Sequence, residues 1–133
     1  MRSPDLASYG FGTWSPFSKA GKSALINSLP VRPGVYAIRC CREFTRKNGS
    51  SDILYLGSAT NAQGVRHRIR QYFSPGPTQR TNIRILALIG DCDDYELAFV
   101  VTKSIPEAKM LEATLLEKYE GEHGELPPEN KRR

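Results

Sequence analysis

The chain has 133 residues and a net charge of +5, a length that suits one domain with its own core and is too short for two comfortable ones. Its apolar and charged fractions, 39% and 25%, are ordinary for a soluble globular protein, and no apolar run approaches the roughly 20 residues of a membrane-spanning helix. Because the three cysteines lack paired spacing and the first residues do not resemble a secretory signal, we expect a cytoplasmic protein without membrane contact, or a nuclear one if its source has a nucleus.

The charge is distributed unevenly along the chain. Residues 34–90 contain nine Arg or Lys and only two acidic residues, whereas residues 91–128 contain ten Asp or Glu and three Lys. A concentrated cationic stretch favours a polyanionic partner, with nucleic acid as the first candidate. A solvated charged surface without a ligand is the alternative interpretation.

The first part of the chain, residues 1–32, predicts an N-terminal arm and a short helix ahead of the main domain, which we place at residues 33–133. Glycines, prolines and scattered aromatic residues predict an irregular arm over the first 16 residues, and the aromatic residues argue against disorder there. A short helix is predicted over residues 18–28, with Ser18 as its cap.

Two apolar runs then predict an antiparallel pair of strands, at residues 35–38 and 53–56. The polar connection between them contains Asn48-Gly49, a step that favours a turn. The first run carries Tyr36 at the end of a Gly-Val-Tyr triplet, and the second carries Tyr55 at the start of a Tyr-Leu-Gly triplet. Tyrosines in strands are most often ordinary packing residues, which is the alternative to a functional role.

Two helices are predicted after this hairpin. Residues 63–73 form a basic amphipathic pattern, because apolar side chains recur at i, i+4, i+7 and i+8. A second helix is predicted over residues 78–89, although residues 83–89 are also compatible with a strand. The basic residues of these helices and of the C-terminal tail are candidates for contacting nucleic-acid phosphates: Arg66, Arg70, Arg80, Arg84 and Lys131.

The last part of the chain predicts a turn at residues 91–94, a third strand at residues 95–101 and a final helix. Ser104 and Glu107 form a capping-box pattern at the start of that helix, which we extend to Tyr119. After the N-terminal arm, the order of elements is β-β-α-α-β-α. This order predicts an α+β fold, with a small three-stranded antiparallel sheet flanked by helices.

Glu112 is the most informative charged residue of the final helix. Ala108, Leu116 and Tyr119 lie on the same side of the helix, so Glu112 interrupts an apolar surface. A carboxylate is costly to bury unless it is paired, hydrogen-bonded or bound to a metal ion. Glu112 is therefore either a functional carboxylate or an ordinary charge at the edge of the apolar surface.

The two tyrosine triplets, as the variants GVY and YLG, resemble the motifs of the GIY-YIG nuclease family, and the resemblance covers about residues 33–131. Each motif is short, but five of them occur in the family's order and on the expected elements. The family is known for a small α/β domain with a three-stranded antiparallel sheet. The resemblance assigns the catalytic positions to Tyr36, Tyr55, Arg68, Tyr72, Glu112 and Asn130.

The resemblance also implies roles for the tyrosines and the arginine. Tyr36 is implied as the general base toward water, and Tyr55 and Tyr72 as hydrogen-bond partners of the phosphate or the nucleophile. Arg68 is implied as the clamp on the scissile phosphate, four residues before Tyr72. Arg66 is the rival for that position, because the preceding loop is a few residues longer than in repair-type members of the family.

The remaining positions imply a metal-dependent reaction. Glu112 is implied to hold one divalent ion, Mg²⁺ or Mn²⁺, and Asn130 to close the site. The implied function is an endonuclease acting on duplex or branched DNA, and the alternative is a catalytically inactive DNA- or RNA-binding module on the same fold. DNA repair, branched-structure cleavage, restriction and mobile-element cleavage remain open, as does action as a homodimer or with a partner protein.

Overall fold

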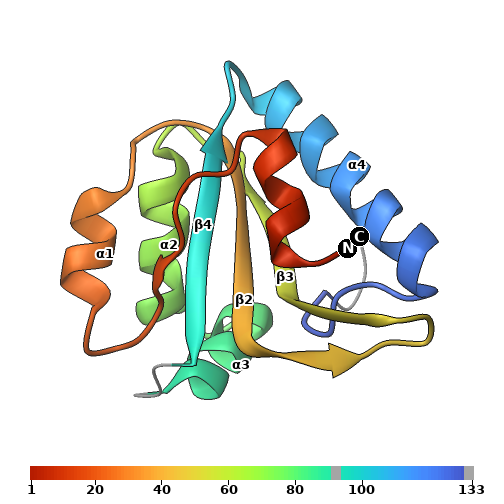
Figure 1. Cartoon of the computed structure of the whole chain (residues 1–133). Helices are drawn as coiled ribbons and strands as arrows, with labels where there is room; N and C mark the ends of the chain where they lie inside the picture. The colour runs from red at the N-terminus through yellow and green to blue at the C-terminus, as the bar shows by residue number, and fades with distance from the viewer. Residues whose placement is uncertain (91–93, 131–133) are drawn as a thin grey trace.

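The computed structural model describes residues 1–90 and 94–130 and shows a four-stranded sheet with helices on both faces (Figure 1). The chain is thus an α+β protein. Among the described residues, no helix combines the length and the apolar character needed to cross a membrane. In chain order the elements are a 3₁₀ helix η1 (Ser3–Tyr9), β1 (Ser15–Pro16), α1 (Lys22–Ser28), β2 (Gly34–Thr45), β3 (Ser50–Ala59), α2 (Gly64–Phe73), α3 (Arg80–Ile89), β4 (Tyr95–Val101) and α4 (Ile105–His123).

The sheet has one strand more than the sequence predicted. Its order is β1-β4-β2-β3, with every neighbouring pair antiparallel, and the additional strand β1 pairs Ser15 and Pro16 with Leu97 and Glu96 of β4. Two residues are too few to show an alternating pattern. Proline also lacks an N–H for the ladder, which restricts it to edge strands such as this one and hides the strand from sequence patterns.

The predicted hairpin is confirmed and is longer than its apolar runs, because β2 and β3 continue through polar residues toward the turn. Gly49 takes a positive φ of 71° there, as the Asn-Gly step predicts. The register places Tyr36 directly opposite Gly57 and Ile38 opposite Tyr55. The two tyrosine motifs therefore lie side by side on neighbouring strands.

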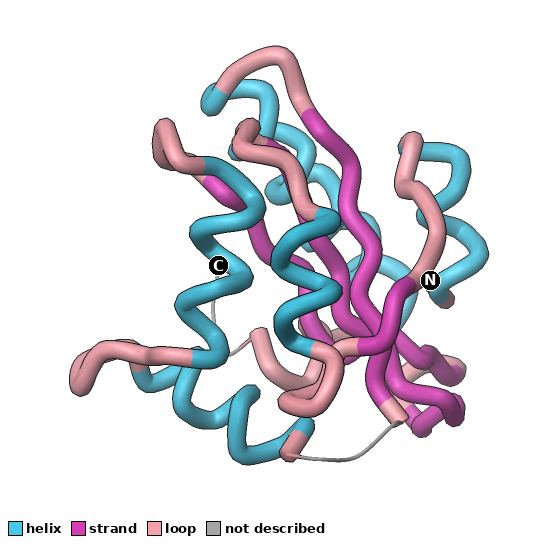
Figure 2. Tube along the Cα trace, turned by 90° about the vertical axis from the view of Figure 1, so that its left-hand side faces the viewer, coloured by secondary structure: helices cyan, strands magenta, loops and turns pink. Residues whose placement is uncertain are grey.

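The helices divide between the two faces of the sheet, each with its own apolar core (Figure 1). Leu6 of η1 and Leu115 of α4 pack on one face, together with Val35 and Leu56 of the strands. Leu25 of α1 and the buried side chains of α2 and α3 pack on the other face, and Figure 2 views the molecule from that side, with helices in front of the strands. The strands' alternation therefore supplies both cores.

The predicted helices are confirmed with small shifts. Residues 83–89 belong to α3 and are helical. The first helix begins at Lys22 and not at Ser18, whose hydroxyl instead accepts a hydrogen bond from the Gly21 N–H in the preceding turn. The predicted turn at residues 91–94 lies largely outside the described residues.

The last helix, α4, extends beyond its predicted end at Tyr119 to His123 and is followed by Gly124 at φ 74°. Ser104 caps its start by accepting from the Glu107 N–H. The Glu107 carboxylate accepts from the N–H of Lys103, one residue before the position that a capping box requires. Only half of the predicted capping box is therefore present.

The first 32 residues are built into the sheet and both cores. The predicted irregular arm contains η1 and β1, and its Leu6 and Phe17 are fully buried, one in each core. Ser3 also donates from its N–H to the Asp52 carboxylate of β3. These contacts tie the arm to the strands that carry the tyrosine motifs.

Candidate active site

Three tyrosines from three elements meet on the face of the sheet covered by α2. Tyr36 of β2 and Tyr72 of α2 are fully buried, and their hydroxyl oxygens are 2.6 Å apart. Tyr55 of β3 is half-buried beside them, and the three ring centroids are 5.9 to 6.4 Å apart. The two motif tyrosines and the tyrosine after the basic helix thus form one cluster.

The glycines of the two motifs are explained by close packing. A Cβ at Gly57 would lie 2.7 Å from the ring of Tyr36 and 2.7 Å from that of Tyr55. A Cβ at Gly34 would lie 2.3 Å from the carbonyl oxygen of Val100 on the neighbouring strand. Only glycine fits at either position without displacing its neighbours.

Arg68 is the arginine that reaches the tyrosines. Its guanidinium carbon lies 4.8 Å from the centroid of the Tyr72 ring, and its Nη1 donates to Asn82 Oδ1 at 2.9 Å. The rival Arg66 points to the chain before β2, where its Nε donates to the Leu29 carbonyl at 2.8 Å. The structure therefore brings Arg68, and not Arg66, to the cluster.

Glu112 approaches from the opposite face of the sheet. It is half-buried on α4 and hydrogen-bonded to Ser58, the residue after Gly57 on β3. Burial raises the pKa of the Glu112 carboxyl above its usual range, while the bond from Ser58 and the charge of Arg68 act in the opposite direction. Among the described residues Glu112 takes part in no ion pair.

The two halves of the site meet around the edge of the sheet. Along β3, Tyr55 packs with the core under α2, whereas Leu56 packs with the core under α4. β3 is an edge strand, so side chains of both faces come together beyond it. The electrostatic influence of Arg68 on both Tyr36 and Glu112 reflects this proximity.

Asn130 is not an open ligand in this structure, because its side chain holds β3. Its Oδ1 accepts from the Leu56 N–H at 3.0 Å and its Nδ2 donates to the Leu56 carbonyl at 2.8 Å. The N–H of Glu129 also donates to the Leu54 carbonyl. This C-terminal segment thus pairs with the edge strand at Leu54 and Leu56, on either side of Tyr55.

Arg84 fixes the same segment from α3. Its Nε donates to the Glu129 carboxylate at 2.5 Å and its Nη2 to the Glu129 carbonyl at 2.8 Å. This predicted nucleic-acid contact is therefore engaged within the chain. Arg70 and Arg80 are exposed, and Lys131 lies outside the described residues.

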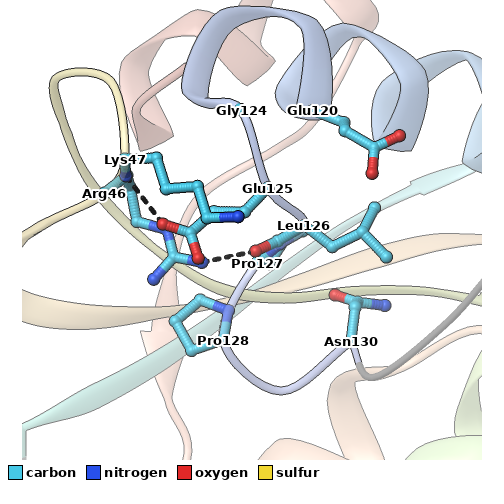
Figure 3. A pocket seen from close by; sticks show the side chains of 9 residues that line it. All are labelled: Arg46, Lys47, Glu120, Gly124, Glu125, Leu126, Pro127, Pro128 and Asn130. Carbon is cyan, nitrogen blue, oxygen red and sulfur yellow. Dashed lines mark hydrogen bonds and ion pairs between the residues drawn. The ribbon is translucent and has the colours of Figure 1, made fainter.

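Asn130 also lines a pocket of about 490 Å³ (Figure 3). Arg46 and Lys47 line it together with Glu120 and Glu125, so its charge is mixed. Arg46 is also committed to its neighbours, with an ion pair of 3.1 Å to Glu125 and a hydrogen bond to the Leu126 carbonyl. These contacts stabilise the turn after α4 and do not favour a phosphate there.

Sequence reasoning missed two polar residues of the site, Ser58 and Asn82. Asn82 shares the buried stripe of α3 with Ile85 and Ile89, at i, i+3 and i+7. An amide among the buried apolar residues of a helix could have marked Asn82 as a residue of the site, because a buried polar group needs a hydrogen-bond partner. For Ser58, no residue pattern in the sequence pointed to the contact with Glu112.

Comparison with known proteins gives a consistent result. Residues 32–123 match the family described as "UvrC-like GIY-YIG domain". One similar protein is the "UvrABC system protein C" of Clostridium botulinum (strain Hall), which is 29% identical over 106 residues, or 80% of this chain. Another is the protein of the same name from Clostridium tetani (strain Massachusetts), which is 28% identical over 103 residues, or 77% of this chain. The matched regions are 15% and 14% of those relatives, so the chain corresponds to a small part of each.

Proposed function

The chain belongs to the UvrC-like GIY-YIG family, and on that premise we propose that it is a metal-dependent endonuclease that hydrolyses DNA phosphodiester bonds. The proposal is supported by the cluster of Tyr36, Tyr72 and Arg68 on one face of the sheet, and by the electrostatic influence that Arg68 exerts on Glu112 of α4. Phosphodiester hydrolysis requires a positioned water, an acceptor for its proton and positive charge on the phosphate oxygens. The residue types of the site suit these three tasks.

Arg68 supplies the positive charge. Nη1 is bonded to Asn82, and the planar guanidinium has further N–H groups with which to donate to two oxygens of one phosphate. Its position over Tyr72 directs these donors toward the tyrosine cluster. Arg68 therefore acts mainly on the charge that develops in the transition state.

Glu112 suits a single hard cation. Within residues 1–90 and 94–130 no group of three or more His, Cys, Asp or Glu is placed to hold a metal ion, which does not suit zinc. Mg²⁺ or Mn²⁺ keeps several waters and needs only one or two carboxylates, and Glu112 is a half-buried carboxylate whose charge lacks an ion pair among the described residues. Such an ion, when bound, supplies Lewis acidity that stabilises the leaving 3′ oxygen.

Tyr36 is the proposed acceptor of the proton from water. Burial raises the pKa of the Tyr36 phenol far above its usual value, and the neighbouring Tyr55 raises that pKa further, so the free protein holds this phenol protonated. The charge of Arg68 and the hydrogen bond to Tyr72 act to lower the same pKa. Arg68 and Tyr72 are therefore the residues that favour loss of the Tyr36 proton, and a cation held by Glu112 would add positive charge to the site.

DNA binding is assigned mainly to the exposed arginines. Arg70 and Arg80 are exposed on α2 and α3, whereas Arg66 and Arg84 are hydrogen-bonded within the chain and contribute less. The relatives are named as one component of a system, which supports a partner protein over isolated action.

Cleavage assays separate this proposal from an inactive DNA- or RNA-binding module. Supercoiled plasmid, linear duplex and branched DNA are each incubated with the protein and Mg²⁺ or Mn²⁺, with Arg68→Ala as the matched control. We expect metal-dependent nicking that the control lacks. Binding of these DNAs without cleavage by either metal, or equal cleavage by the control, refutes the proposal.

A further inference from the structure

A chain of hydrogen bonds leads from the active-site arginine into the loop between α2 and α3. Arg68 Nη1 donates to Asn82 Oδ1 at 2.9 Å, and Asn82 Nδ2 donates to Gln79 Oε1 at 3.0 Å. Gln79 Oε1 also accepts from the Gly76 N–H at 2.8 Å. The chain therefore connects the guanidinium to a backbone amide of the loop.

The chemistry of its two ends fixes the direction of this chain. A guanidinium and a backbone N–H are donors only, so the amide oxygens of Asn82 and Gln79 must face them. The Asn82 NH₂ group then faces the Gln79 oxygen, as it must to be satisfied. Neither amide can be reversed without placing two donors or two acceptors against each other.

Packing alone does not explain an asparagine at this position. Asn82 is 2% exposed and shares its stripe with Ile85 and Ile89, where an apolar side chain of the same size would avoid burying an amide. Each of its two polar side-chain atoms has a partner, Oδ1 in Arg68 and Nδ2 in Gln79. The amide is thus matched to the arginine.

We propose that Asn82 is a positioning residue for DNA cleavage, which orients the Arg68 guanidinium over Tyr72, and that Gln79 holds Asn82 in the orientation that this requires. The proposal rests on the proposed nuclease function. By occupying Nη1, Asn82 fixes the plane of the guanidinium, whose other N–H groups lie toward Tyr55 and the proposed place of the phosphate. The loop at Gly76 becomes part of the catalytic apparatus through this connection.

The kinetic test compares two substitutions of similar size. Asn82→Leu removes the acceptor and keeps the branched shape with the same number of heavy atoms, whereas Asn82→Asp keeps an oxygen for Nη1. In single-turnover cleavage of plasmid DNA with Mn²⁺, we expect Asn82→Leu to lower the rate constant by about 10- to 100-fold, with less than about a threefold change in half-saturating DNA concentration. Asn82→Asp should recover only part of the rate, because it keeps the bond to Arg68 and loses the one to Gln79. Equal rates for the two variants, or a wild-type rate for Asn82→Leu, overturn the proposal.

A double-mutant cycle shows whether Asn82 acts through Arg68. Combined with Arg68→Lys, Asn82→Leu should cost less than about a threefold further loss, because the group that it orients is already gone. Ile83→Ala, at an exposed neighbouring position of α3, is the control and should keep the wild-type rate. Independent, multiplicative losses in the double variant contradict a positioning role.

A spectroscopic measurement tests the inference apart from catalysis. The Nε–H NMR signal of Arg68 is identified by its absence in Arg68→Lys. It should be sharp in the wild-type protein and shifted or broadened in Asn82→Leu, with Ile83→Ala unchanged. An unaltered signal in Asn82→Leu overturns the positioning role, even if the wild-type protein cleaves DNA. If the signal is altered in Asn82→Leu but the wild-type protein cleaves no DNA, only the nuclease function is overturned.

Discussion

Replacing Gly57 by alanine is a direct test of the tyrosine cluster. The new Cβ would lie 2.7 Å from Tyr36 Cζ, from Tyr36 Oη and from Tyr55 Cε2, and ordinary contacts begin at 3.4 Å. The rings must therefore retreat by about 0.7 Å. Tyr55 is half-buried and can move toward solvent, but Tyr36 is fully buried against Tyr72 and has no free volume to enter.

The expected effect is larger on catalysis than on folding. Forcing extra volume into a packed site typically costs about 1–3 kcal/mol, which for a domain of this size corresponds to a fall in Tm of roughly 4–12 °C. Displacing Tyr36 also disturbs its 2.6 Å bond to Tyr72. Because a misplacement of about 1 Å can cost about 100-fold in rate, we expect nicking to fall by at least that factor.

Melting curves and plasmid nicking with Mn²⁺ measure the two effects. Gly121→Ala is the matched control, since a Cβ at Gly121 meets no atom within 4 Å and the residue lies within α4. The control should be stabilised by about 0.5–1 kcal/mol and remain fully active. If Gly57→Ala cleaves like the wild type per folded molecule, the tyrosine cluster is not the centre of catalysis.

Four further substitutions test other parts of the site. Arg68→Ala should abolish cleavage and keep most DNA binding. Arg70→Ala should weaken DNA binding and reduce the slope of its salt dependence by about one, as measured by DNA titration at several salt concentrations. The reverse pattern would show that the roles of the two arginines are exchanged. Glu112→Gln should fold, bind DNA and fail to cut. Because burial raises the pKa of Glu112 in the folded state, ionising this carboxyl lowers stability as pH rises through that pKa. The variant's Tm should therefore equal or exceed the wild type's at pH 7, and the two should converge toward pH 4. Arg84→Ala should lower stability by about 1 kcal/mol in melting experiments, because it releases Glu129, and an unchanged Tm would remove that structural role.

The sequence predicted the parts of the site that depend on local pattern. The hairpin follows from two apolar runs and an Asn-Gly turn, and its two strands carry Tyr36 and Tyr55 as predicted. The helical period of α4 placed Glu112 beside buried Ala108 and Leu116. Each of these inferences needs only neighbouring residues and one periodicity.

The parts that the sequence did not predict depend on contacts between distant residues. Arg84 and Arg70 look alike in sequence, since both are basic residues on amphipathic helices. One is bound to Glu129, 45 residues later, and the other is exposed. Strand β1 was missed for a similar reason, because its two residues are a strand only through their pairing with β4. No local pattern carries such information.

The strand order explains how one sheet can hold a site with parts on both of its faces. Tyr36 lies under α2, which carries Tyr72, whereas Glu112 lies on α4, so these groups can approach one another only around an edge strand. β3 provides that edge, and the clamp of Asn130 on Leu56 pairs it just before Gly57 and Ser58. The additional strand β1 joins β4 at the opposite edge. A strand added at that edge leaves the site uncovered. A further strand along all of β3 would instead cover the place between the tyrosines and the Glu112 carboxylate.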